Sequence, residues 1–202
     1  MWVTEIEVKG KKEKYSVCED FITGDTELVA AFRVSKLIAA NNNTSKYEAF
    51  VKKAEELGIA DARQRIDMML VLDFIIVNID RHYNNFGLVR DANTLEWLRI
   101  APIFDSGNSM WFENQHTRIN PTAVHFESKC FNSTLHDQMK HIKDYSWLNL
   151  LLLDGIEDEF AQILENATPA EDYNPERTEA LCKALRKRIE MLRAIVNKRQ
   201  GR

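Results

Sequence analysis

The sequence predicts a mainly helical fold of the α+β class, with short β-hairpins near one central loop. Apolar residues recur at helical spacing over most of the chain after residue 26, and two apolar stretches flank the turn Asp91–Thr94. With 202 residues, 45% of them hydrophobic, the chain is long enough to bury one substantial core and is most simply a single domain.

The N-terminal part predicts two strands followed by a helix. The strands are expected at Trp2–Val8 and Lys14–Cys18, around a turn at Gly10. Roughly helical spacing of apolar residues then predicts a helix over Thr26–Ala40, ended by Asn41–Asn43; these residues are Leu28, Val29, Phe32 and Ile38.

Two further helices lead into the central loop. Ser45 followed by Glu48 is a capping-box pattern, and it predicts a helix that ends at Gly58. Asp61 is expected to cap the next helix, which runs to about Val77. Its second half is apolar nearly all round, which is typical of a central buried helix.

After this loop the sequence predicts a hairpin, a mixed polar region and more helices. The hairpin strands are Phe86–Arg90 and Leu95–Ile100, and residues 108–140 give weak signals. The remaining elements are a helix at Tyr145–Leu153, a turn at Asp154–Gly155, a helix at Ile156–Asn166, a linker at Ala167–Tyr173 and a last helix from Pro175 to about Lys198, capped by Asn174.

The loop itself contains the chain's clearest chemical signal. Residues 78–85 read N-I-D-R-H-Y-N-N, and residues 103–107 read I-F-D-S-G. Asp80 and Asn85 are five residues apart, as are the catalytic Asp and the metal-binding Asn of protein kinases. Asp105 comes just before a Ser-Gly pair, at the position where a kinase carries the Asp that binds magnesium. Phosphoryl transfer needs a group that orients the acceptor hydroxyl and oxygen ligands for a hard cation, and these residue types supply both. Arg81 and His82 can bind phosphate or fix the loop.

Two longer stretches carry a family resemblance. Residues 73–90, D-F-I-I-V-N-I-D-R-H-Y-N-N-F-G-L-V-R, and residues 100–111, I-A-P-I-F-D-S-G-N-S-M-W, resemble the C-terminal lobe of HipA-like serine/threonine kinases, especially the CtkA-type branch. The resemblance extends more loosely to Val17–Phe21 and into the helical tail. It implies the helical C-terminal lobe of a protein-kinase-like fold over residues 1–202, with strands and hinge in 1–21 and a catalytic lobe in 22–202.

The resemblance also implies roles for single residues. Asp80 corresponds to the catalytic base, with Arg81 and His82 beside it in the catalytic loop, and Asn85 and Asp105 correspond to magnesium ligands. Glu19, Asp20 and Phe21 correspond to the hinge that receives adenine. The implied cofactors are ATP and Mg²⁺, and the implied reaction moves the γ-phosphate of ATP to a serine or threonine hydroxyl of a protein substrate.

One departure from the family concerns the N-terminal lobe. A complete kinase covers the phosphates with a glycine-rich loop and pairs them with a lysine on a strand. The seven glycines of this chain form no G-x-G, and the residues before the hinge-like segment are too few for such a lobe. We therefore expect the N-terminal ATP-clamping lobe to be absent from these residues, as in a fragment or a split protein. A separate lobe or an antitoxin-like protein is the expected partner, and the isolated chain is expected to be weakly active or inactive.

Composition sets bounds on location and partners. A net charge of −4 argues against direct nucleic-acid binding and against an anionic membrane surface as a partner. The cysteines are odd in number and scattered, which fits a reducing compartment. The start of the chain lacks the features of a secretory signal, and the longest apolar run is too short to span a bilayer. The sequence therefore predicts a cytoplasmic protein.

Three other functions stay open at this stage. The chain could be a noncatalytic interaction module of a toxin–antitoxin type, or an orphan lobe that binds a regulator. A D-R-H-x-x-N core also occurs in phosphoinositide kinases, so the motif indicates the chemistry better than the acceptor. The third alternative is a metal-dependent hydrolase that uses Asp80, His82 and Asp105, but the sequence offers no further carboxylate or histidine ligands for the metal.

Asp73, a charged residue within an apolar stretch, is expected to pair with a nearby loop.

Overall fold

The computed structural model describes residues 2–39, 43–123, 126–168 and 173–201, and it has a mixed α/β architecture in which helices predominate. In chain order the elements are β1 (Trp2–Val8), β2 (Lys11–Val17), β3 (Thr26–Ala30), α1 (Ala31–Ser35), α2 (Lys46–Glu56), α3 (Ala62–Ile76), β4 (Gly87–Asp91), β5 (Trp97–Ile100), η1 (His116–Arg118), α4 (Leu135–Gln138), η2 (Met139–His141), η3 (Leu150–Leu153), α5 (Ile156–Ala167) and α6 (Pro175–Arg199), where η marks a short 3-10 helix. Among the described residues, no helix is both long and apolar enough to cross a bilayer.

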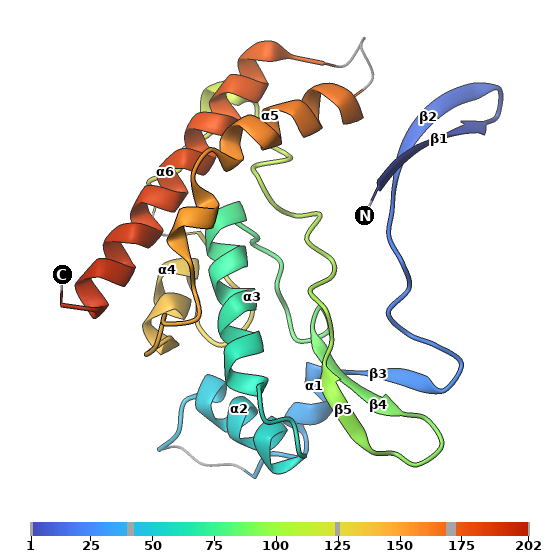
Figure 1. Ribbon diagram of the computed structural model, residues 1–202, viewed down its shortest axis with the longest axis vertical. Helices are drawn as coiled ribbons and strands as arrows, with labels where there is room; N and C mark the ends of the chain where they lie inside the picture. Colours follow the sequence, from blue (N-terminus) through green and yellow to red (C-terminus); the bar gives the residue numbers. More distant parts are fainter. Residues whose placement is uncertain (1, 40–42, 124–125, 169–172, 202) are drawn as a thin grey trace.

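The first two strands form an antiparallel hairpin that stands apart from α3 and α6 (Figure 1). Its turn is made by Lys9 and Gly10, which both have positive φ angles, 51° and 77°. Two such residues produce the tight turn whose twist matches that of the flanking strands. The expected strand Trp2–Val8 is confirmed, whereas the second strand begins at Lys11, three residues before the predicted start.

A second antiparallel sheet has the order β3-β4-β5 and lies at one end of α3 (Figure 1). The predicted hairpin between Phe86–Arg90 and Leu95–Ile100 is confirmed as β4 and β5. The predicted helix over Thr26–Ala40 is wrong in its first part, because residues 26–30 form β3 and pair with β4. Its helical part is the short α1, and residues 40–42 lie outside the described residues.

The hydrophobic core is built around α3, which lies between the second sheet and α6 (Figure 1). Most of its residues are buried, as expected from its nearly all-apolar second half. Arg188 of α6 is 1% exposed, and its Nε and Nη2 atoms donate to the carbonyl of Phe74 at 2.9 and 2.7 Å. This contact fixes α6 against the last turns of α3, directly before the central loop.

Most of the predicted helix boundaries agree with the structure. The side chain of Ser45 accepts a hydrogen bond from the backbone of Glu48 at the start of α2, and Asn174 caps α6 with Pro175 in its first turn. Asp61 precedes α3 as expected, but its side chain pairs with Arg65 and makes no cap bond. Of the expected linker at 167–173, residues 169–172 lie outside the described residues.

The predicted helix at Tyr145–Leu153 is wrong, because only η3 forms there. The side chain of Asp144 accepts from the backbone N–H of Ser146, and that of Asn149 accepts from Leu151. Such local bonds offer the backbone an alternative to helical hydrogen bonding. In the weak-signal region 108–140, the described residues likewise form only short helical elements, namely η1, α4 and the start of η2.

Candidate active site

The central loop begins where α3 ends in a left-handed residue. Val77 has φ 54° and ψ 53°, and its N–H bonds back to the carbonyl of Asp73. The side chain of Asn78 then donates to Asp73 Oδ1 at 2.9 Å and accepts from the backbone N–H of Asp80 at 3.1 Å. The end of the helix therefore sets the position of the first loop residues.

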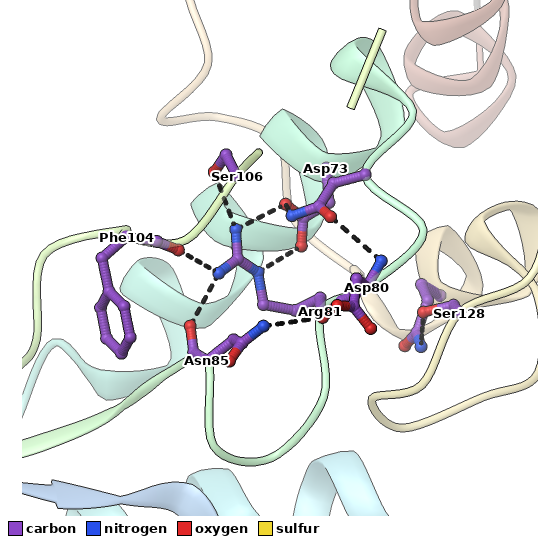
Figure 2. A network of polar contacts seen from close by, with 9 residues as sticks. Asp73, Asp80, Arg81, Asn85, Phe104, Ser106 and Ser128 are labelled. Atoms are coloured by element: carbon purple, nitrogen blue, oxygen red, sulfur yellow. Dashed lines mark hydrogen bonds and ion pairs between the residues drawn. The ribbon is translucent and has the colours of Figure 1, made fainter. Parts of the chain in front are cut away.

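Arg81 is the centre of the loop's hydrogen-bond network (Figure 2). Its Nε and Nη2 atoms donate to the two carboxylate oxygens of Asp73 at 2.9 and 3.0 Å. Nη1 donates to the carbonyls of Asn85 and Phe104, and Nη2 donates also to the hydroxyl of Ser106. These bonds use all five N–H groups of the guanidinium. Because the side chain is 1% exposed, Arg81 fixes the loop, which is the second of the two roles considered for it.

Asp73 lies inside the core, and it pairs with the loop as expected. Its side chain is 2% exposed, and that of Arg81 is 1% exposed. Burial raises the pKa of the Asp73 carboxyl, and the hydrogen bonds from Arg81 oppose that rise. A buried carboxylate with these partners joins α3 to the loop.

Asp80 occupies a different environment, at the protein surface. Its side chain is 24% exposed, and Lys129 Nζ lies 2.6 Å from Oδ1. Asn108 Nδ2 donates to Oδ2 at 2.9 Å. The hydrogen bond from Lys129 holds the pKa of the Asp80 carboxyl below its usual range, with a further contribution from Asn108. The carboxylate is therefore ionised at neutral pH and can accept a hydrogen bond from a hydroxyl.

His82 and Asn85 complete the loop. The backbone N–H of His82 donates to the carbonyl of Asp80, and its Nδ1 accepts from the N–H of Asn84 at 3.2 Å. His82 therefore braces the loop. The side-chain nitrogen of Asn85 donates to the carbonyl of Asp80 at 2.9 Å, which leaves its amide oxygen for another ligand.

Asp105 lies on the segment that Arg81 holds against the loop. The residues on either side of it, Phe104 and Ser106, both accept hydrogen bonds from Arg81, as does the carbonyl of Asn85. Asp105 is exposed, has a positive φ of 52°, and makes no hydrogen bond or ion pair within the described part of the chain. A left-handed conformation is uncommon for a residue other than glycine, and such residues often occur at functional sites.

The donor set of Asn85 and Asp105 fits a small hard cation. Mg²⁺ is usually held by one or two carboxylates together with phosphate oxygens and water, so few protein ligands are needed. In the described residues no group of three His, Cys, Asp or Glu side chains is suited to holding a metal ion. A cation bound by Asn85 and Asp105 would therefore depend on a phosphorylated ligand.

The hinge-like residues lie close to this segment. The ring of Phe21 stacks on that of Phe104, with centroids 5.6 Å apart and an interplanar angle of 30°. The carbonyl of Phe21 accepts from Arg99 at 3.1 Å. Glu19 and Asp20 are exposed, and Asp20 Oδ1 accepts from the N–H of Ile22. The candidate adenine-facing residue therefore contacts the residue before Asp105.

Sequence reasoning missed two side chains that contact Asp80. Asn108 lies three residues after Asp105, and Lys129 lies 49 residues after Asp80 in a region of weak signals. Neither position belongs to the recognised motifs. Their contacts with Asp80 form only when the fold brings together residues that are far apart in the sequence, so no local sequence pattern reveals them.

Similarity to a known kinase, in sequence and in fold, indicates a kinase-like protein. The serine/threonine-protein kinase CtkA of Helicobacter pylori is 29% identical over 109 residues, a match that covers 46% of this chain and 30% of that kinase. The crystal structure of the proinflammatory kinase CtkA of H. pylori matches with a TM-score of 0.66 at 18% identity, over 98% of this chain and 80% of that chain. No protein-family model matches. The chain is homologous to CtkA, a HipA-like kinase, by sequence and structure.

Proposed function

We propose that this chain is the C-terminal catalytic lobe of a HipA-like serine/threonine kinase, which transfers the γ-phosphate of ATP to a protein hydroxyl. One observation carries the proposal. Arg81 hydrogen-bonds to the carbonyl of Asn85 and to the residues on both sides of Asp105, so the two candidate metal ligands share one buried anchor. Asp80 is one residue from that anchor and is ionised and accessible.

Each residue then has a defined part in the reaction. Asp80 accepts a hydrogen bond from the acceptor hydroxyl and orients its oxygen towards the γ-phosphorus. Asn85 and Asp105 present oxygen ligands to Mg²⁺, which when bound neutralises phosphate charge. Glu19, Asp20 and Phe21 form the adenine-facing hinge, and Phe104 supports Phe21.

The proposed C-terminal lobe has two parts. Residues 1–21 provide strands and hinge, and residues 22–202 provide the catalytic lobe. The sequence contains no G-x-G loop for the phosphates. That part of the clamp is supplied by residues outside 1–202, on the same or another polypeptide.

Two substitutions test the assignment of the site. In a kinase reconstituted with the missing ATP-clamping lobe, and with Mg-ATP and a protein acceptor, Asp80→Ala and Asp105→Ala should each lower the rate of phosphate transfer by about 10²–10⁴-fold, the usual contribution of a proton-accepting group and of charge stabilisation. Asp158→Ala is the matched control, because this exposed aspartate lies on α5, away from the loop. Full activity in both site variants would refute the assigned roles.

Thermal stability separates a nucleotide-binding lobe from a noncatalytic module. A ligand that binds the folded state raises the melting temperature, so Mg-ATP should stabilise the wild-type chain more than ATP with EDTA. Asp105→Ala should remove the magnesium-dependent part of this shift. A chain that shows neither stabilisation nor transfer would contradict the proposed function.

A further inference from the structure

Lys129 and Asn108 hold the two oxygens of the Asp80 carboxylate. Lys129 Nζ lies 2.6 Å from Oδ1, and Asn108 Nδ2 lies 2.9 Å from Oδ2. Lys129 comes from a segment far along the chain, and its side chain is 53% exposed, so a ligand in solvent can reach it.

The backbone around Lys129 is firmly held. Glu127 and Thr134 form an isolated antiparallel bridge, and the N–H of Ser128 bonds to the carbonyl of Ser133. The hydroxyl of Ser128 accepts from the buried side chain of Gln138 at 2.8 Å. On the other side of Lys129, Cys130 and Phe131 are 6% exposed and pack in the core. With both flanking residues buried, Lys129 is directed outward at a fixed position.

We propose, on the basis of the kinase function proposed above, that Lys129 Nζ binds the phosphoryl group while it is transferred to the acceptor. A carboxylate oxygen has two lone pairs, so Asp80 Oδ1 can accept from Lys129 and from an acceptor hydroxyl together. An oxygen that is bonded to Asp80 and attacks phosphorus brings the phosphoryl group close to Lys129. The ammonium has three N–H groups, and Asp80 takes one of them.

Among the described residues, the other cation hydrogen-bonded within this loop network, Arg81, has no donors to spare. Arg81 is buried, and all five of its N–H groups are engaged. Lys129 is the exposed cation in direct contact with Asp80. Its pKa is raised by the hydrogen bond with Asp80, so it carries its charge at neutral pH.

In the proposed step, the acceptor oxygen attacks the γ-phosphorus of ATP. A lone pair of the acceptor oxygen forms the new O–P bond, and the bond from the γ-phosphorus to the bridging oxygen breaks. That electron pair leaves with ADP, and the hydroxyl proton passes to Asp80. Lys129 forms and breaks no covalent bond. Its ammonium donates hydrogen bonds to the non-bridging oxygens and stabilises charge at the transferring group.

Binding of a phosphoryl mimic tests this role without turnover. Calorimetry with Mg-ADP alone and with Mg-ADP plus aluminium fluoride compares wild type with Lys129→Met, using the full chain. Lys129→Met should leave the Kd for Mg-ADP unchanged and weaken the aluminium fluoride complex about 10- to 100-fold, the usual effect of losing a charge-assisted hydrogen bond. Lys140→Met is the matched control, because Lys140 forms a similar surface pair with Asp137 at 2.5 Å.

The outcomes distinguish this inference from the proposed function. If wild type binds no Mg-ADP, the kinase function fails and the role of Lys129 fails with it. If wild type binds both ligands and Lys129→Met binds them equally well, only the role of Lys129 is refuted.

A kinetic comparison adds a second readout. In the kinase reconstituted with the missing ATP-clamping lobe, Lys129→Met should lower kcat by about 10²–10³-fold with little change in the KM for ATP, and Lys129→Arg should recover part of the loss. An increase in kcat in Lys129→Met would instead identify the ion pair as an inhibitory contact and overturn the inference.

Discussion

Arg81 and Asp73 form a two-point ion pair inside the protein, with Nε–Oδ2 and Nη2–Oδ1 distances of 2.9 and 3.0 Å. The two residues lie eight positions apart, one in the loop and one in α3. Arg81 also binds the carbonyls of Asn85 and Phe104. The position of α3 therefore determines where the central loop at Asn85 and the segment at Phe104 lie.

Breaking this pair should destabilise the fold strongly. Arg81→Met leaves the Asp73 carboxylate buried without its counter-charge, and the free energy of unfolding should fall by about 3–5 kcal/mol. Urea denaturation measures the change. Arg65→Met is the control: its pair with Asp61 is about half exposed, and a loss below about 1 kcal/mol is expected. Equal losses in the two variants would contradict a structural role for the Asp73–Arg81 pair.

The double variant Asp73→Leu/Arg81→Met separates stability from site geometry. Removing both charges should restore much of the stability lost in Arg81→Met, because no unpaired charge remains in the core. Phosphate transfer should stay low, because the carbonyls of Asn85 and Phe104 still lack their shared donor. Recovery of both properties would show that Arg81 is not needed to assemble the site.

The contact between Phe21 and Phe104 should support nucleotide binding. Phe21→Ala removes the stacked ring beside the Asp105 segment, and the Kd for Mg-ADP should rise by about two- to tenfold, as expected for an aromatic pair. Isothermal titration calorimetry gives the Kd. Phe32→Ala is the matched control, since its ring is 47% exposed and contacts Lys36 instead. An unchanged Kd in Phe21→Ala would remove Phe21 from the hinge.

Local signals in the sequence predicted much of the framework. Caps at Ser45 and Asn174 place α2 and α6, because the cap bond is made within three residues. The loop residues Asp80 and Asn85 were likewise recognisable by their spacing. A sequence pattern can predict helix caps and loop motifs because these depend on residues that are close together in the chain.

The missed features depend on distant partners. β3 reads as a helix in isolation and becomes a strand because β4 supplies its hydrogen bonds. Lys129 and Asn108 reach Asp80 only after the chain has folded. The anchoring role of Arg81 could be named only as one of two alternatives, since choosing between them requires knowing its burial.

Gly87 should be required for the pairing of β3 with β4. A Cβ atom at this position would lie 2.3 Å from the carbonyl oxygen of Val29 and 2.9 Å from the Cα of Ala30, so the two strands would have to move apart. Gly87→Ala should therefore lower the free energy of unfolding by about 1–3 kcal/mol, measured by urea denaturation. Gly24→Ala, where a Cβ meets nothing within 4 Å, should change it by less than about 0.5 kcal/mol. A neutral Gly87→Ala would mean that this strand pairing is looser than the structure shows.

Stability should also depend on pH through the buried pair Tyr47–Asp67. The Tyr47 hydroxyl donates to Asp67 Oδ1 at 2.5 Å, and Asp67 is 3% exposed. Burial raises the pKa of the Asp67 carboxyl to about 6, against the opposing effects of the Tyr47 hydrogen bond and Arg63. In the unfolded chain an aspartate titrates near about 3.9. Between these two pKa values the folded state binds more protons than the unfolded state. The stabilising contribution of the protonated Asp67 is therefore complete below about pH 4 and is lost as the pH rises through about 6.

Replacement of Asp67 by asparagine isolates this contribution. Asp67→Asn keeps an acceptor for Tyr47 but cannot ionise, so its free energy of unfolding should decline less between pH 4 and 7 than that of wild type. A shift of about two pKa units corresponds to a difference of at most about 3 kcal/mol across this range. Urea denaturation at several pH values measures both curves, and other titrating groups cancel in the comparison. Parallel curves would mean that Asp67 titrates as it does in the unfolded chain, and that the buried site imposes no cost on its charge.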